Sequence, residues 1–111
     1  MKVRKRWSKE KVADAICRAV IRQNYCDEEG LPLLVLDKET LHFLRRKYWL
    51  PARRVWQLKN WAKEDGLISI HPMSPTTITP DNAHIPDVYI INQEFYDKEI
   101  KPYLSGTPEI Y

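Results

Sequence analysis

Hydrophobic residues near the start of the chain recur with the spacing of one helical face. They follow the i, i+3, i+4, i+7, i+8 pattern, which puts them on a single stripe of an amphipathic helix. These residues are Val12, Ala15, Ile16, Ala19 and Val20. Ser8 precedes them and is a type of residue that caps free helical amides. The pattern therefore predicts a helix over 9–24 that ends near the sequence CDEEG.

Two more helices are predicted on either side of a short break. Asp37 can cap a helix over 38–48, in which Leu41, Leu44 and Tyr48 share one face. After the break, a third helix is expected over 51–65. Proline is well tolerated at the first helical position and glycine commonly follows the last, as Pro51 and Gly66 would here.

The remaining apolar segments have the lengths of short strands. The run LPLLVL, over 31–36, reads as one strand. Segments 67–71 and 88–91 read as the two strands of a hairpin, and the four prolines of 71–87 predict an irregular loop between them. A last helix is expected over 93–104, capped by Asn92. Its predicted apolar residues are Phe95, Ile100, Tyr103 and Leu104.

This order of elements resembles that of the winged helix-turn-helix superfamily. The resemblance covers residues 8–92 and includes the tight YWLPA turn before the third helix. It implies an α+β fold with a three-helix core, a short strand and a two-stranded wing, followed here by the C-terminal helix. It also implies that the helix after the turn enters the major groove of DNA. The chain would then divide into a flexible basic arm (1–7), the winged domain (8–92) and a C-terminal helix and tail (93–111).

Charge is distributed unevenly along the chain. Residues 1–63 carry 16 Lys or Arg against 7 Asp or Glu, a net of +9, whereas residues 64–111 carry 2 against 8, a net of −6. The two values sum to the overall charge of +3. A basic half joined to an acidic half suggests that one side of the molecule meets a polyanion.

The third helix offers the side chains that a DNA-reading helix needs. When it is drawn at 100° per residue, Val55, Leu58 and Ala62 form a buried stripe. Arg53, Gln57 and Asn60 lie on the opposite side. Arginine pairs with guanine edges, and the amides pair with adenine edges. These three residues are our candidates for base reading.

Basic residues around the third helix are candidates for phosphate contacts. They are Arg45, Arg46, Lys47, Arg54, Lys59 and Lys63. The N-terminal residues Arg4, Lys5 and Arg6 could extend into a neighbouring minor groove. The same cations would also solubilise an exposed helix without any ligand. The absence of carboxylates among them favours nucleic acid.

The tryptophans suggest an alternative function. Trp49, Trp56 and Trp61 could stack on bases or pack against sugars. Trp49 and Trp61 are nevertheless expected in or near the core, because tryptophan in a small domain is more often packed than exposed. Trp56 is predicted to point outward and could belong to a protein interface. The loop over 72–87 lacks Lys and Arg over residues 73–86, unlike wings that touch DNA. The chain could therefore be a protein-interaction module without specific DNA recognition, contacting a partner through this loop or the C-terminal segment.

Catalytic and metal-binding motifs are not evident. Three glycines cannot form a glycine-rich phosphate loop, and the histidines and cysteines lack ligand spacing. We expect no enzyme activity, no cofactor and no metal.

The unpaired cysteines and the lack of a long apolar run predict a cytoplasmic protein with no membrane association, located at the nucleoid if it binds DNA. If the protein binds DNA, we expect it to act in transcriptional regulation, or as an accessory factor in replication or recombination. Its small size is compatible with a phage or mobile-element protein. The last helix could pair two copies into a homodimer.

Overall fold

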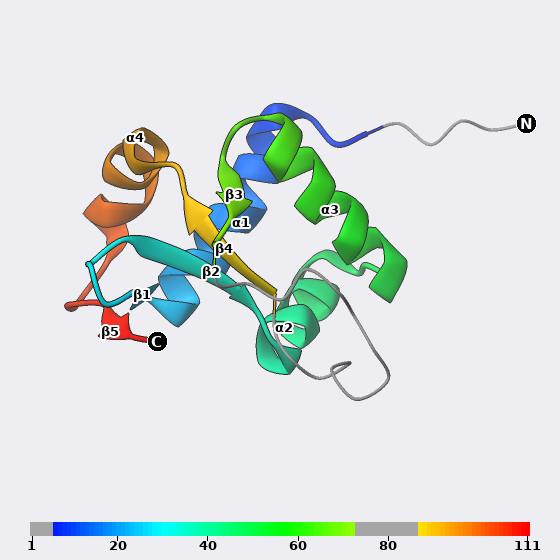
Figure 1. The fold of residues 1–111 in the computed structure, drawn as a ribbon. Coiled ribbons are helices and arrows are strands. Elements are labelled where there is room, and N and C mark those ends of the chain that lie inside the picture. The colour runs from blue at the N-terminus through cyan, green and yellow to red at the C-terminus, as the bar shows by residue number, and fades with distance from the viewer. Residues whose placement is uncertain (1–5, 73–86) are drawn as a thin grey trace, which may run out of the picture.

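The structure is a computed structural model that describes residues 6–72 and 87–111. Within these residues the chain forms an α+β fold with four helices and one mixed five-stranded sheet. Figure 1 shows the sheet on one side of the molecule and α2 and α3 on the other, with α1 between them. The α+β class is as predicted, but the sheet contains more strands than the sequence suggested.

Helix α1 spans Lys9–Gln23 and has the predicted buried stripe. The Ser8 side chain accepts a hydrogen bond from the Lys11 amide at 3.2 Å, which confirms the expected N-cap. The helix ends at Asn24, whose backbone is left-handed. Helix α1 contacts β2 of the sheet and both α2 and α3, so it forms the centre of the core.

Helices α2 (Lys38–Tyr48) and α3 (Ala52–Glu64) flank a short turn. Asp37 caps α2 by accepting from the Thr40 amide at 2.9 Å, as predicted. Pro51 has an extended backbone and immediately precedes α3 instead of forming its first helical residue. Gly66 follows α3 with a φ of +75°, a conformation that glycine adopts without strain.

The sheet is built around the fully buried strand β2 (Pro32–Leu36). One neighbour is β4 (Asp87–Ile91), which also pairs with β3 (Ile68–Ile70), so the predicted hairpin is confirmed. The other neighbour is β1 (Tyr25–Cys26), which pairs in parallel with β5 (Glu109–Ile110). The strand order is β3-β4-β2-β1-β5. Strands β1 and β5 were not predicted, because two residues are too few to show an alternating pattern.

One polar side chain from α1 completes the hydrogen bonding of β2. The side-chain oxygen of Gln23 accepts from the Val35 amide at 3.0 Å, and its nitrogen donates to the Val35 carbonyl. The same nitrogen donates to the hydroxyl of Thr40, which is buried. Gln23 thus takes the place of a neighbouring strand where the short β1 ends.

The C-terminal segment is helical over the predicted range but is not a regular α-helix. It begins as α4 (Gln93–Phe95), capped by Asn92, which accepts from the Phe95 amide at 3.0 Å. It continues as a π-type turn, η2 (Tyr96–Ile100), and a 3₁₀ turn, η3 (Lys101–Tyr103). Tyr96 and Ile100 are buried in the same core as α1, whereas Tyr103 is exposed.

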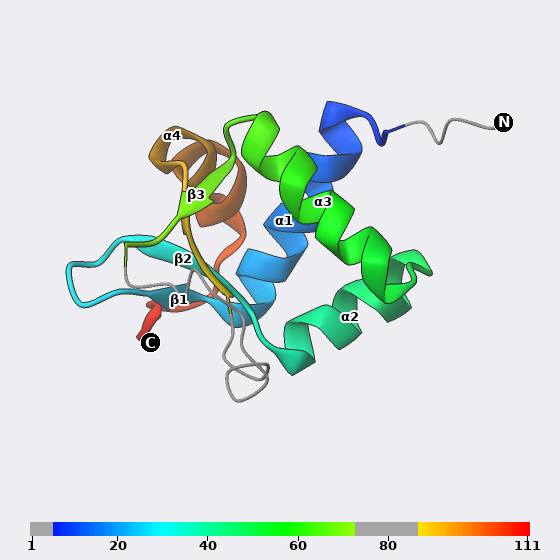
Figure 2. The same ribbon diagram turned by 45° about the vertical axis from the view of Figure 1, so that its right-hand side comes forward.

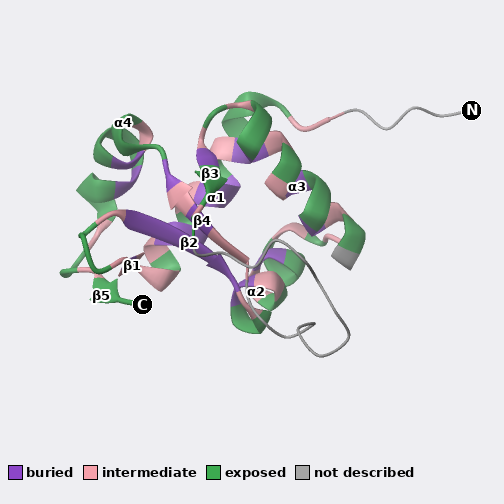
Figure 3. Cartoon of the chain, in the orientation of Figure 1, coloured by how far each residue is buried: buried purple, intermediate pink, exposed green. Residues whose placement is uncertain are grey.

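The hydrophobic core lies between the sheet and the helices. Figure 3 shows buried positions along β2 and exposed positions over the outer surfaces of α2 and α3. In the views of Figures 1 and 2, α2 and α3 meet at a corner on the side of the molecule away from β5. Among the described residues, no helix combines the length and the apolar character needed to cross a membrane.

Candidate nucleic-acid interface

Helix α3 has the two faces that its sequence predicts. Val55, Leu58 and Ala62 are buried. Arg53, Gln57 and Asn60 are exposed, and we call these three residues the α3 face. Gln57 accepts a hydrogen bond from the guanidinium of Arg54 at 3.0 Å. Three groups with hydrogen-bonding capacity are thus presented along two turns of one helix.

A group of cations surrounds the turn between α2 and α3. We call Arg45, Arg46, Lys47, Arg53 and Arg54 the corner cluster. Arg54 is half-buried and the other four are exposed. No carboxylate occurs over residues 40–63. Within 6–72 and 87–111, no ion pair involves the corner cluster, so its positive charge is not neutralised by the described part of the chain.

Lys59 differs from the other candidate phosphate ligands. Its ammonium lies 3.8 Å from a carboxylate oxygen of Asp87 on β4 and 4.0 Å from the centre of the Trp56 ring. Its side chain is only 15% exposed. Burial lowers the pKa of Lys59, and the Asp87 carboxylate opposes this effect. The role of Lys59 in phosphate binding stays a prediction, and its geometry indicates an internal contact between α3 and the sheet.

Lys63, the last of the predicted phosphate ligands, is exposed near the end of α3. Arg53 and Arg54 of the corner cluster lie near the start of α3, whereas Lys63 lies in its last turn. A polyanion that follows the α3 face would meet positive charge at both ends.

Three of the four tryptophans contact another ring or a cation. Trp7 lies 5.6 Å from Tyr48 and 6.1 Å from Trp61, measured between ring centres. Trp56 is 40% exposed, as its outward direction predicts, and one of its faces is covered by Lys59. Trp49 is 91% exposed, so the expectation that it packs in or near the core is wrong. Its position in the turn directs no part of the ring toward the core.

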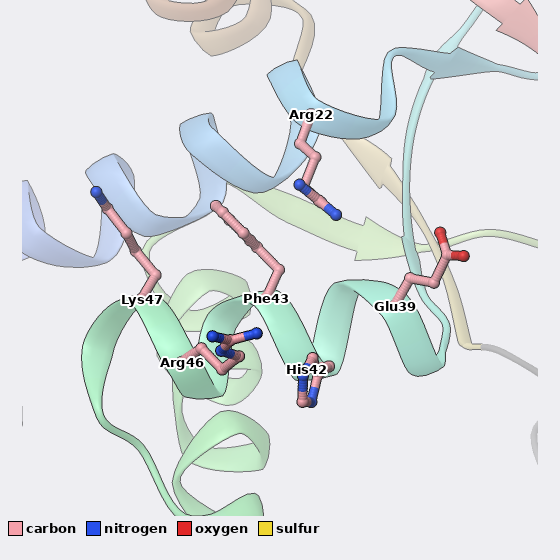
Figure 4. A pocket seen from close by; sticks show the side chains of 6 residues that line it. All are labelled: Arg22, Glu39, His42, Phe43, Arg46 and Lys47. Atoms are coloured by element: carbon pink, nitrogen blue, oxygen red, sulfur yellow. The ribbon is translucent and has the colours of Figure 1, made fainter.

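A shallow pocket extends the basic surface along α2 toward α1. Figure 4 shows Arg22 of α1 near Phe43, with Arg46 and Lys47 one turn further along α2. The guanidinium of Arg22 lies 4.9 Å from the centre of the Phe43 ring. His42 and Glu39 complete the lining. Arg22 was not among the candidates, because its sequence position in α1 gave no sign that it would lie beside the end of α2.

The N-terminal segment is attached to α3 at residues 6 and 7. Arg6 forms ion pairs with Asp65 and, at 3.5 Å, with Glu64. Trp7 packs beside Trp61 and beneath the ammonium of Lys11, 4.2 Å from its ring. Residues 6 and 7 of the predicted flexible arm (1–7) thus contact α3 and α1 through a charge pair and aromatic contacts, and the flexibility of the arm stays a prediction. Arg4 and Lys5 lie outside the described residues.

The β1–β2 turn forms a different kind of site. Asp27, in the β1–β2 turn, accepts from the Leu31 and Glu29 amides at 2.9 Å each, and its other oxygen lies 3.4 Å from His71. The predicted loop contact surface, apart from Pro72 and Asp87, lies outside the described residues. In the described part of the chain, no three His, Cys, Asp or Glu side chains are grouped to hold a metal ion.

Comparison of the chain with protein-family models, with curated proteins and with solved structures finds no match. The fold, the α3 face and the corner cluster are therefore the features of the molecule that bear on its function.

Proposed function

We propose that the protein binds double-stranded DNA in a sequence-specific manner, as a small winged helix protein acting in transcription, replication or recombination. The observation that carries this proposal is the α3 face beside an unneutralised corner cluster. Arg53, Gln57 and Asn60 would read base edges in the major groove. The other cations of the corner cluster, together with Lys63 and Arg22, would contact phosphates.

The arrangement of the sheet supports the winged helix assignment. Strand β2 follows α1 and precedes α2, and it pairs with β4, the second strand of the hairpin that follows α3. The hairpin is thus paired with the strand between α1 and α2, and β3 contacts α3, which supports the order of elements that the resemblance implies. Strands β1 and β5 and the C-terminal helical segment add to this arrangement without changing its order.

The test is a selection of bound duplexes from a random pool, followed by fluorescence-anisotropy titration of the selected site and of scrambled sites. We expect Gln57→Ala to lose discrimination at one or two base pairs, by about 1–3 kcal/mol per lost base contact. We expect Lys63→Ala to weaken binding to all duplexes alike, because a phosphate contact carries no sequence information.

Lys98→Ala is the matched control, since Lys98 is also exposed on a helical segment but lies in the acidic half. It should leave DNA binding unchanged. Equal losses for Gln57→Ala and Lys63→Ala on every sequence would remove the base-reading role of the α3 face. Failure of the wild-type protein to bind any duplex at low salt would reject the proposal and favour the protein-interaction module.

A further inference from the structure

The Trp49 side chain does not pack in the hydrophobic core. Its ring is 91% exposed, and its backbone, with a φ of +55°, occupies the left-handed region at the end of α2. The Arg45 carbonyl accepts hydrogen bonds from the amides of Trp49 and Leu50, so the backbone alone closes the helix. Glycine or asparagine is the usual residue in this conformation. Neither packing nor backbone geometry explains an indole here.

Both faces of the Trp49 ring are open within the described residues. The other tryptophans are covered by Tyr48, by one another or by a lysine ammonium. Trp49 forms no such contact with residues of 6–72 or 87–111. A large flat surface of this kind is available for stacking with a planar partner.

The charges around Trp49 define the chemistry of that partner. Arg45, Arg46 and Lys47 precede it in the last turn of α2, and Arg53 follows it in the first turn of α3. A ligand complementary to these cations and to the exposed indole carries several negative charges and exposed planar rings. Paired duplex DNA supplies the charges but keeps its bases stacked inside. An unpaired nucleotide supplies both a phosphate and a free base.

We propose that Trp49 stacks on an unpaired nucleobase adjoining the duplex bound by the α3 face, so that the preferred ligand is DNA with a single-stranded end or a bulged base. This inference rests on the proposed duplex binding and names a more specific substrate for the same site. The indole is the stacking platform, and the neighbouring cations of the corner cluster hold the phosphates on either side of the unpaired base.

The test compares anisotropy titrations of three labelled DNAs that share one duplex sequence: a blunt duplex, the same duplex with a short single-stranded overhang, and the same duplex with one bulged base. The readout is the ratio of affinity for each modified DNA to affinity for the blunt duplex. Wild-type protein should show a ratio of roughly ten or more, the size expected for one base stacked on an aromatic ring. Trp49→Gly should bring this ratio to about one, and Trp49→Phe should retain most of it.

Lys63→Ala is the control for charge, because Lys63 lies in the last turn of α3, outside the corner cluster, so its loss should weaken binding to all three DNAs and leave the ratio unchanged. A urea titration of Trp49→Gly should show unfolding at the wild-type midpoint or above, since the ring is exposed and glycine fits the backbone. A wild-type ratio of one, or the same ratio in Trp49→Gly, would overturn the inference while duplex binding stands. Failure to bind the blunt duplex would instead reject the proposed function.

Discussion

Gln23 joins three parts of the fold with one side chain. It lies at the end of α1 and bonds both backbone groups of Val35 on β2 and the hydroxyl of Thr40 on α2. Removing a partner of a buried backbone group costs more than an average hydrogen bond contributes, because the group keeps its desolvation penalty. The importance of this residue could not be predicted from the sequence, where it reads as an ordinary polar position near the end of a helix.

We therefore expect Gln23→Ala to lower the free energy of unfolding by about 1–3 kcal/mol for each backbone group left unpaired. Urea denaturation followed by circular dichroism would measure this change. Gln93→Ala serves as a control, because the Gln93 side chain is exposed and bonds only to Asp97 in the described structure. A loss for Gln23→Ala no larger than that of the control would show that water replaces the side chain without cost.

Helix caps were the residues most reliably predicted. The side chains of Ser8, Asp37 and Asn92 each accept a hydrogen bond from the backbone amide three residues later in the chain, as predicted from their residue types and positions. Such caps depend only on local chain geometry, so a sequence reveals them. The exposure of Trp49 was not predicted. Nothing local forces an indole out of the core, and the average behaviour of tryptophan pointed the other way.

At the scale of elements, the long segments were predictable and the short ones were not. The boundaries of α1, α2 and α3 differ from the expected ranges by one residue at most. Strands β1 and β5 are defined by their pairing with other strands, and the two-residue sequences YC and EI give no signal of that pairing. In the C-terminal segment Tyr96 is buried although it was not among the predicted apolar residues, whereas Tyr103, which was, is exposed in the 3₁₀ turn.

The β1–β2 turn should make stability depend on pH. The backbone amide of Leu31, and then that of Glu29 together with His71, hold the pKa of Asp27 below its ordinary value, although partial burial opposes them. A carboxyl group with a lowered folded-state pKa stabilises the protein above its unfolded-state pKa, and this contribution is lost as pH falls through the folded value. We therefore expect Asp27→Asn to be less stable than wild type near neutral pH.

The difference between the two proteins should shrink as pH falls below about 4, where the unfolded carboxyl takes up a proton. Urea midpoints measured between about pH 7 and pH 3 would show this convergence. Asparagine keeps a side-chain oxygen for the Leu31 and Glu29 amides, so the comparison isolates the charge. A difference that stays constant over this range would mean that the carboxylate charge of Asp27 contributes nothing to stability.

At the scale of the whole molecule, the basic half should make DNA binding strongly dependent on salt. Each neutralised phosphate releases counterions and contributes about −0.9 to the slope of log K against log salt. If Arg22, Arg45, Arg46, Lys47, Arg54 and Lys63 each contact one phosphate, the slope should be about −5.4. Titrations of one duplex at several salt concentrations would measure it.

Two lysines of α3 should behave differently in this measurement. Lys63→Ala should reduce the steepness of the slope by about 0.9, because its ammonium is exposed. Lys59→Ala should leave the slope unchanged, since Lys59 lies against Asp87 and Trp56. Equal changes for the two variants would show that Lys59 leaves Asp87 when DNA binds, and would restore it to the phosphate ligands.

Part of the candidate interface could be predicted from the sequence. Position along one helix fixes which residues share a face, so Arg53, Gln57 and Asn60 could be selected from spacing alone. Contacts between elements are set by the tertiary fold. The structure was therefore needed to find three contacts: Lys59 with Asp87, Arg6 with Asp65, and Arg22 with α2.

The placement of the chain ends has a practical consequence for studying this protein. Trp7 packs on Trp61, so any group fused before residue 6 emerges beside α3, whereas β5 and Tyr111 lie at the far edge of the sheet. A fluorophore or surface anchor joined after Tyr111 would leave α3 unobstructed. Immobilisation through the C-terminal end is thus the orientation of choice for biosensor assays, and an N-terminal affinity tag should be cleaved before any of them.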